Sequence, residues 1–395
     1  MNWPVFRLDD VSEIFAGNPA PQESADFADD GFLFVRMQDV GREHHTSNLR
    51  DSHDKVSSDA VSRYRLRLFP AGSILIPKSG ASINLNHRAM LGNDAYVVSH
   101  LAIVVPNSEK LLPEYLYFWS LAYDPRNQAQ TTSLPSLPLS LIKAAPIAVP
   151  PLDEQRRIVD ILSRADGIVR LRREAQKKAA ALIPALFVDM FGDPATNPKM
   201  WPIVSVGDIV VAVDYGSSTK ASDYGAGIPF IRMGNVDYAG YTDLSNLKYV
   251  ELSPEEVERY CLLEGDILFN RTNSKELVGK TGIWTGLCEA VVASYFIRLR
   301  VKREILNPFY LWAFLNTAYM KRVLFETARG AIGQSNINAK ELKAFIIGLP
   351  PLNLQNNFER RCRDLFGIKT QQSAATAKAE ATFNALLGRA FQGIL

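Results

Sequence analysis

The chain has 395 residues, more than a single hydrophobic core usually serves, so two domains are expected. Hydrophobic residues make up 47% and charged residues 22% of the sequence, the composition of an ordinary globular protein. The N-terminal segment lacks the features of a signal peptide, and no apolar run is long enough to cross a bilayer, so we expect a cytoplasmic protein without a membrane partner. A net charge of +2 argues only weakly for a polyanion partner, so any DNA binding requires a locally basic face.

Cysteine and histidine usage gives no sign of a metal site. The three cysteines, Cys261, Cys288 and Cys362, have no CxxC spacing, so the sequence suggests neither a disulfide framework nor a zinc cluster. The five histidines also lack the spacing of metal ligands. We therefore predict no bound metal.

Residues 1–150 are predicted to form a mixed α/β domain. Runs of β-branched and aromatic residues at 72–76 and 96–105 predict strands. Pro113 stands where a proline fits the first turn of a helix, ahead of an amphipathic stretch over 115–121.

A double proline at 150–151 marks a change to helical periodicity. Asp153 and Glu154 are placed in the first turn of a predicted long helix over residues 151–192. The apolar residues that we assign to its heptad seam are Ile158, Ile161, Ala165, Ile168, Ala175, Ala179, Leu182 and Leu186. A linker is expected at residues 193–200.

The same order of elements is predicted again from residue 201. Residues 201–350 form a second mixed α/β domain, with strands at 267–270 and 291–301 and a short helix that begins at Pro308. A second long helix covers 351–392, and its seam consists of Phe358, Leu365, Ile368, Ala375, Ala379 and Leu386. Each helix of roughly 35 residues would be about 50 Å long. We expect the two helices to pack antiparallel as a coiled-coil spacer with a domain near each end.

The two halves share sequence matches at an offset of about 200 residues. The matches occur in one order: Trp3-Pro4-Val5 with Trp201-Pro202-Ile203, Phe34–Val40 with Phe230–Val236, Gly72–Leu75 with Gly265–Leu268, Pro113–Leu116 with Pro308–Leu311, and Pro150–Asp153 plus Gln155 with Pro350–Asn353 plus Gln355. Coincidence of common turn residues is a poor explanation for a constant order and spacing. The chain therefore contains an internal repeat.

This order resembles the specificity subunit of type I restriction–modification systems over almost the whole chain. The resemblance includes the proline-led helices, the stretch Phe191–Pro194 and the second start at Trp201-Pro202. The segment Glu264–Ser274 is similar to the target-recognition signature of that family, and Ala71–Ser79 is a looser copy.

The resemblance implies an α+β protein in which two target-recognition domains each read one half of a split site in double-stranded DNA. It implies that the helices set the spacing and dock two methyltransferase subunits, together with restriction subunits. It also implies that the chain has no catalytic residues or cofactors, since S-adenosylmethionine, ATP and Mg²⁺ belong to the partner subunits.

Two other functions explain the sequence less well. A stand-alone DNA methyltransferase is disfavoured because no glycine-rich donor loop is present, and because Asn307–Tyr310, which looks like a base-holding loop, fits the first turn of a helix better. A coiled-coil scaffold that binds only protein explains the helices but not two repeated domains with polar runs.

Readout of bases requires donors and acceptors on loops that can enter a groove, while phosphates are contacted by Lys, Arg and Ser. Three polar runs have this character. The candidate DNA-binding residues are Lys78, Ser79, Asn84, Asn86 and Arg88 in the first domain, and Ser217, Thr219, Lys220, Arg271, Thr272, Asn273, Ser274 and Lys275 in the second.

Overall fold

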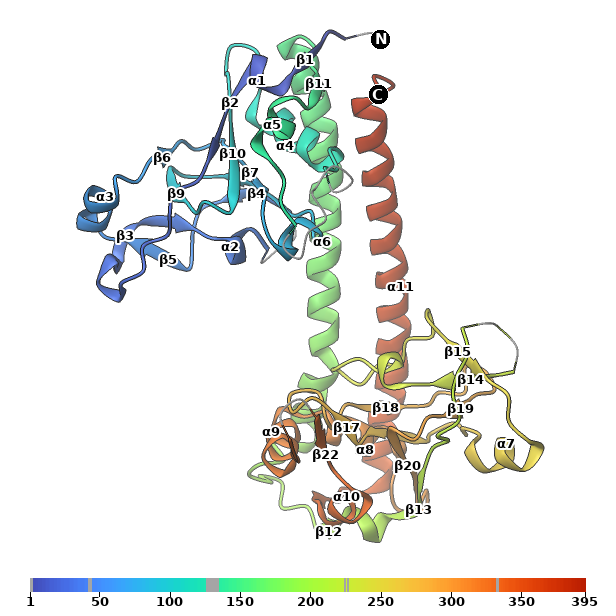
Figure 1. Ribbon diagram of the computed structural model, residues 1–395. Helices are drawn as coiled ribbons and strands as arrows, with labels where there is room; N and C mark the ends of the chain where they lie inside the picture. The colour runs from blue at the N-terminus through green and yellow to red at the C-terminus, as the bar shows by residue number, and fades with distance from the viewer. Residues whose placement is uncertain (1–2, 42–44, 126–134, 224, 226, 332–333) are drawn as a thin grey trace. The chain divides into compact units, whose positions relative to one another are not determined.

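The computed structural model describes residues 3–41, 45–125, 135–223, 225, 227–331 and 334–395. The chain divides into two compact units, Met1–Arg172 with Ala375–Leu395, and Arg173–Ala374. Each unit contains one mixed α/β domain and parts of two long helices, α6 (Leu152–Phe191) and α11 (Leu352–Phe391), as Figure 1 shows. The predicted fold class is confirmed. We call the α/β part of the first unit domain 1 and that of the second unit domain 2.

The elements of domain 1 come from the segment before α6. Its helices are α1 (Leu8–Val11), α2 (Met37–Gly41), α3 (Ser58–Tyr64), α4 (Pro113–Ala122) and α5 (Leu139–Lys143), with short 3-10 turns at Ser24–Asp26 and Ala81–Ile83. Its strands are β1 (Val5–Arg7), β2 (Ser12–Ala16), β3 (Phe27–Val35), β4 (His45–Leu49), β5 (Asp54–Val56), β6 (Leu68–Phe69), β7 (Ile74–Pro77), β8 (Arg88–Leu91), β9 (Ala95–Val97), β10 (Leu101–Pro106) and β11 (Pro146–Ala148). The sheets have the orders β2-β10-β7-β8-β4, β5-β3-β9-β6 and β1-β11.

Domain 2 repeats this plan between the two long helices. Its helices are α7 (Pro254–Tyr260), α8 (Pro308–Leu315), α9 (Ala318–Thr327) and α10 (Ala339–Ala344), with 3-10 turns at Val206–Ile209 and Met233–Asn235. Its strands are β12 (Ile203–Ser205), β13 (Val210–Tyr215), β14 (Ile228–Ile231), β15 (Lys248–Val250), β16 (Ile267–Asn270), β17 (Thr272–Asn273), β18 (Thr281–Ile283), β19 (Val291–Val292), β20 (Phe296–Val301), β21 (Arg329–Ala331), β22 (Gln334–Asn336) and β23 (Ile346–Gly348). The sheets have the orders β13-β20-β16-β18, β15-β14-β19, β17-β22-β21 and β12-β23.

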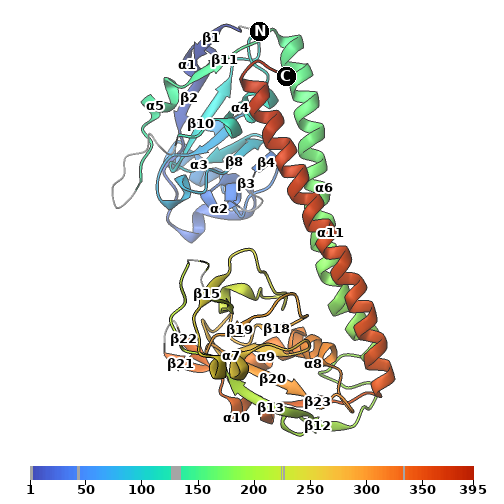
Figure 2. The same ribbon diagram turned by 90° about the vertical axis from the view of Figure 1, so that its right-hand side faces the viewer.

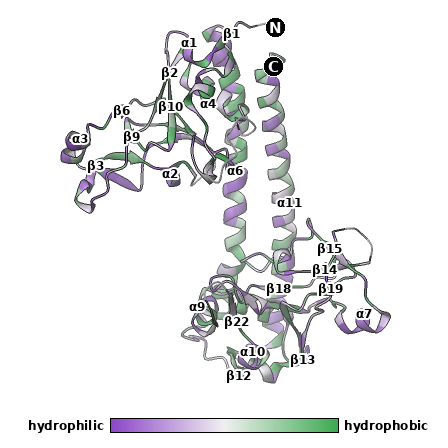
Figure 3. Ribbon diagram, in the orientation of Figure 1, coloured by the Kyte–Doolittle hydropathy of each residue, from purple (hydrophilic) through white to green (hydrophobic). Residues whose placement is uncertain are grey.

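The central strands explain why each domain has two layers of core. Successive side chains of a strand point to opposite faces, so a strand buried on both faces is apolar throughout. In β7, Ile74 and Ile76 pack with α4, whereas Leu75 packs with the β3–β9 layer. In β16, Ile267 and Phe269 pack with α8, whereas Leu268 faces the opposite cluster. The apolar character of β10 and α4 is visible in Figure 3.

A glycine turn precedes the central strand in both domains. Gly72 and Gly265 have φ angles of 84° and 91°, a region that residues with a Cβ rarely adopt. An added Cβ would also meet Pro113 at 3.1 Å and Pro308 at 3.0 Å. The repeated glycine therefore lets the turn approach the repeated helix closely.

Within each unit the two long helices run antiparallel. In the first unit Ile158, Leu162 and Val169 of α6 share a core with Phe383 and Leu387 of α11. Figures 1 and 2 both show α4 beside these helix segments. The second unit pairs the other parts of the same helices.

The buried seam differs from the prediction at one of its two heptad positions. Ile158 is buried as predicted, but Ile168, Leu182 and Ile368 are 54%, 45% and 44% exposed. A seven-residue period does hold for the buried side chains, which are Gln155, Leu162, Val169, Ile183 and Met190 in α6 and Gln355, Cys362, Thr376, Phe383 and Ala390 in α11. Ile168 and its neighbour Val169 are both apolar, and both fit a seven-residue period. The sequence pattern therefore could not show which of the two is buried in the seam.

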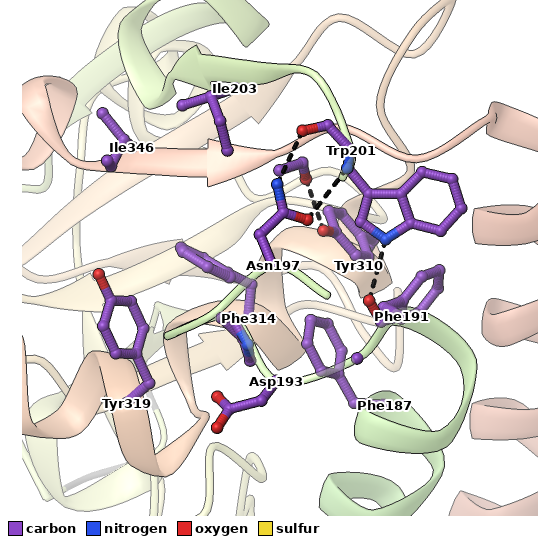
Figure 4. Close-up of a pocket in the computed structure, with 13 residues that line it drawn as sticks. Phe187, Phe191, Asp193, Asn197, Trp201, Ile203, Tyr310, Phe314, Tyr319 and Ile346 are labelled. Carbon is purple, nitrogen blue, oxygen red and sulfur yellow. Dashed lines mark hydrogen bonds between the residues drawn. The ribbon is translucent and has the colours of Figure 1, made fainter. Parts of the chain in front are cut away.

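The end of each long helix docks on the domain of its unit through a tyrosine. Phe191 of α6 packs edge-on against Tyr310 at 4.7 Å, and the Tyr310 hydroxyl donates to the Gly348 carbonyl at 2.6 Å, as seen in Figure 4. Phe391 of α11 lies 5.3 Å from Tyr115, whose hydroxyl donates to the Ala148 carbonyl at 2.8 Å. The repeat therefore includes the docking of the helix ends.

Candidate DNA interface

Lys78 and Arg271 occupy the same position of the repeated fold. Each follows directly on the buried central strand, β7 or β16. The backbone N–H of Lys78 donates to the His100 carbonyl at 3.0 Å, and that of Arg271 donates to the Tyr295 carbonyl at 2.9 Å. The weak sequence match between the two runs thus corresponds to a true structural equivalence.

In domain 2 the Arg271 side chain is held by two neighbours. Its guanidinium lies over the ring of Tyr215 at 4.8 Å, and its Nε donates to the Ser294 carbonyl at 3.0 Å. Within the described part of the chain, its two terminal nitrogens have no hydrogen-bond partner. A planar guanidinium fixed in this way suits bidentate donation to guanine.

Two polar runs that are separate in the sequence of domain 2 meet at the turn Ser294-Tyr295. The Ser294 N–H donates to the Ser217 carbonyl at 2.7 Å, while the Ser294 carbonyl accepts from Arg271. Tyr295 is 47% exposed. The sequence analysis missed this turn, because a Ser-Tyr pair is common and forms no recognisable motif.

The other predicted residues of domain 2 divide by burial. Ser217 is buried, and its hydroxyl donates to the Thr219 hydroxyl at 3.0 Å, so it supports the loop from inside. The exposed members that follow it are Thr219 and Lys220.

Residues 271 to 275 also include both buried and exposed side chains. Thr272 is buried in β17, where it pairs with Asn336, and Asn273 donates to the Asn270 side chain at 2.9 Å. The Ser274 N–H donates to the Asn273 side chain at 2.9 Å. Lys275 is exposed, with its ammonium over the Phe325 ring at 4.4 Å. Arg271 and Lys275 are therefore the members of this run best placed to meet DNA.

In domain 1 the structure argues against a DNA contact by Arg88. Its side chain is only 1% exposed in β8, and it donates to the carbonyls of Ser120 at 3.0 Å and Tyr123 at 3.1 Å at the end of α4. Asn86, with a φ of 51°, accepts from the same guanidinium at 2.7 Å. Arg88 is thus a buried cap for the carboxyl end of a core helix. Asn84, four residues before Arg88, is exposed.

A hollow lined by His100, whose carbonyl accepts from the Lys78 N–H, adds residues that the sequence did not indicate. The Ser79 hydroxyl is hydrogen-bonded to Nδ1 of His100 at 2.7 Å. His100 also lines an open hollow of about 670 Å³ together with Gln22, Arg36 and Gln38. The glutamine amides offer the donor and acceptor pair that suits adenine. Arg36-Met37-Gln38 lies within the repeated segment Phe34–Val40, and this repeat is the feature of the sequence that could have indicated these residues.

Two lysine ammonium groups of domain 2 form hydrogen bonds within the domain. The Lys280 ammonium donates to the carbonyls of Met233 at 2.9 Å and Val236 at 2.8 Å, and burial lowers its pKa. Burial and the nearby Lys280 also lower the pKa of Lys321 to about 8. The charges of Lys280 and Lys321 are therefore less available to a polyanion than those of exposed residues such as Lys220 and Lys275.

Comparison with known proteins decides the family. The model described as the type I restriction modification DNA specificity domain matches residues 1–180 and 198–360. The chain belongs to this family. The structural repeat agrees with two specificity domains in one chain.

Curated relatives in this family include specificity subunits from bacteria and archaea. The chain is 26% identical to the EcoKI specificity subunit of Escherichia coli over 63% of this chain and 57% of the relative. It is 30% identical to the putative MjaX specificity subunit of Methanocaldococcus jannaschii over 46% of this chain and 44% of the relative. Both alignments thus cover only about half of the relative's length. The EcoBI specificity subunit of E. coli is 21% identical over 100% of this chain and 86% of the relative.

Solved structures support the fold of the specificity subunit. A chain from a study of complex assembly and conformational transition of the type I restriction–modification system matches with a TM-score of 0.56, 19% identity, and coverage of 100% of this chain and 98% of the other. The S subunit from M. genitalium matches with a TM-score of 0.53, 12% identity, and coverage of 99% and 96%.

The segment Asn307–Tyr310, which looks like the base-holding loop of a methyltransferase, has a structural role in this chain. Asn307 caps α8, its side chain accepting from the Phe309 N–H at 2.9 Å, and Pro308 and Tyr310 are buried. This confirms the predicted first turn of a helix. Among the described residues there is no group of three or more His, Cys, Asp or Glu side chains arranged for a metal. The helices in the described ranges are also too short or too polar to span a bilayer.

Proposed function

We propose that this chain recognises a bipartite sequence in double-stranded DNA as the non-catalytic specificity subunit of a type I restriction–modification complex. Each domain reads one half of the target. The observation that carries the proposal is that both domains place a basic residue directly after the buried central strand and next to an exposed turn. This residue is Lys78 in domain 1 and Arg271 in domain 2. Readout residues on loops of a rigid scaffold are typical of sequence-specific binding.

The partners in this proposal are two methyltransferase subunits and restriction subunits, which bind S-adenosylmethionine, ATP and Mg²⁺. Exposed apolar residues on the long helices support docking of protein there. Ile168 and Leu171 are 54% and 68% exposed in the first unit, and Val188 is 49% exposed in the second. Ile168 and Leu171 are three residues apart and so lie on one face of the helix, and contiguous apolar surface supports a protein interface. Such a complex would act on DNA in the cytoplasm.

A stand-alone methyltransferase receives less support, because its candidate base-holding segment is the capped start of a buried helix. A scaffold that binds only protein does not explain why the Arg271 guanidinium is held by Tyr215 and the Ser294 carbonyl.

Exchange of one domain tests the proposal. Residues 201–350 are replaced by the matching segment of a related specificity subunit, and the hybrid is purified with its methyltransferase partners. We expect methylation mapping to show one changed half of the target and one retained half. A change in both halves, or binding without sequence preference in the parent complex, would overturn the proposal.

A further inference from the structure

A glutamine is fully buried in the first turn of each long helix. Gln155 and Gln355 both have 0% exposed surface. They stand at equivalent positions after the repeated prolines, and both belong to the buried heptad position of their helices. A buried amide must find partners for its oxygen and its nitrogen.

Both glutamines use the same partners in their respective domains. The Gln155 oxygen accepts from the Leu112 N–H at 2.9 Å, and its nitrogen donates to the carbonyls of Lys110 and Pro150, each at 2.8 Å. The Gln355 oxygen accepts from the Asn307 N–H at 2.8 Å. Its nitrogen donates to the carbonyls of Ile305 at 3.2 Å and Pro350 at 2.7 Å.

These bonds connect the long helix to the most buried helix of the domain. Leu112 and Asn307 are the N-caps of α4 and α8, which carry much of the core. The carbonyls of Lys110 and Ile305 lie in the loops that lead into those helices. One side chain therefore fixes three backbone segments: the core helix, its approach loop and the proline corner.

An apolar residue of similar size cannot replace this function. Leucine at position 155 would leave the Leu112 N–H and the Lys110 and Pro150 carbonyls without these bonds inside the protein. Unsatisfied buried groups are costly, and motion of the helix start relative to the domain would let water reach them.

The joint of the second unit has additional polar contacts. The Asn307 amide nitrogen donates to the side chains of Asn356 at 2.9 Å and Glu359 at 2.6 Å. Arg363 of α11 pairs with Glu264 at 2.6 Å. The residue that corresponds to Asn307 in the first unit is Leu112, whose apolar side chain cannot form such a network. The first joint therefore depends more on its glutamine.

We propose that Gln155 and Gln355 are positioning residues that hold each DNA-reading domain at a fixed angle to its helices and so limit the spacing accepted between the two half-sites. The inference rests on the proposed function. A domain that pivots on its helix would still read its own bases, but it would reach them at more than one distance from the other half.

The test uses the chain in complex with its methyltransferase subunits and a DNA library with constant half-sites and variable separation. For Gln155→Leu we expect unchanged half-site sequences and binding to targets one base pair shorter or longer that rises about tenfold relative to the preferred spacing. Gln355→Leu should give a smaller rise, because the other polar contacts of that joint remain.

Gln176→Leu is the matched control. Gln176 occupies the same heptad position of α6, but its amide nitrogen donates to the Ser373 hydroxyl of the neighbouring helix α11 at 3.1 Å. This variant should keep the parental spacing preference. Gln155→Asn keeps an amide oxygen and an amide nitrogen on a shorter side chain and should give a partial broadening, which keeps the test valid if Gln155→Leu fails to fold.

Hydrogen exchange supplies a second measurement. Faster exchange at Leu112 and in the first turn of α6, with unchanged exchange in β7 and β10, would support a loosened joint. An equal loss of affinity at every spacing, or the parental preference in both leucine variants, would overturn the inference. Absence of sequence-specific binding by the parent complex would instead overturn the proposed function.

Discussion

In domain 2 the central strand is followed by an arginine that is stacked on Tyr215 and bonded to the Ser294 carbonyl, whereas in domain 1 the equivalent strand is followed by Lys78, whose backbone N–H donates to His100 at the edge of an open hollow. The strand register shows why. Tyr215 pairs with Ile297 in β13–β20, and the corresponding pair in β2–β10 is Ala16 with Ala102. Alanine cannot support a cation. At the same position the scaffold therefore presents a guanidinium held against a ring in domain 2 and a lysine ammonium in domain 1. Under the proposed function, this difference suits two unlike half-sites.

Arg88 offers the strongest way to break this comparison, because domain 1 would also have a planar donor if this arginine met DNA. Its burial at the end of α4 predicts that Arg88→Ala destabilises domain 1 by about 3 kcal/mol, through loss of charged hydrogen bonds to carbonyls. Thermal unfolding of the purified chain would measure this. At a temperature where the variant is folded, its base preferences should equal those of the parent. A relaxed base position with normal stability would return Arg88 to the DNA interface.

Arg271→Ala should weaken binding to the full target by about 2 kcal/mol if the guanidinium makes a bidentate base contact. The loss should be confined to targets that carry the preferred base at one position of one half-site. Competition binding with single-base variants of the target, at one stated salt concentration, would measure it. An equal loss for all sequences would assign Arg271 to phosphate binding and remove the main difference between the domains.

The repeat, the fold class and the equivalence of Lys78 and Arg271 could be predicted from the sequence, because turns and helix starts depend on local residues such as Gly72 and Pro113. Burial depended on partners distant in the chain. Nothing near Arg88 in sequence indicates that the end of α4 supplies its acceptors. The choice between Ile168 and Val169 for the helix seam likewise needed the packing of the partner helix. The turn at Ser294 became recognisable only when the fold brought it to Arg271.

Tyr215→Ala tests whether stacking, and not the arginine alone, distinguishes domain 2. A cation–π contact that is desolvated on DNA binding contributes about 1.5 kcal/mol, so affinity should fall by that amount with the same base preference. Tyr215→Phe keeps the ring and should bind like the parent. The hydroxyl accepts from the Ala339 N–H at 3.4 Å, a long contact whose loss should matter little. If both variants weaken binding equally, the hydroxyl and not the ring positions the arginine.

Lys78 gives the smallest expected effect and sharpens the comparison from the side of domain 1. A lysine ammonium without an aromatic support is a point charge on a flexible stem, which suits a phosphate better than a base edge. Lys78→Ala should therefore cost about 1 kcal/mol at low salt, equally for all target sequences, and should lower the slope of log affinity against log salt by about one. Titrations at several salt concentrations measure that slope. Lys78→Arg adds a planar donor but not its support, since Ala16 stands where domain 2 has Tyr215, so it should restore affinity without a new base preference. A new preference at one base in this variant would show that the strand end alone selects the contact, and that the tyrosine does not determine how the two domains differ.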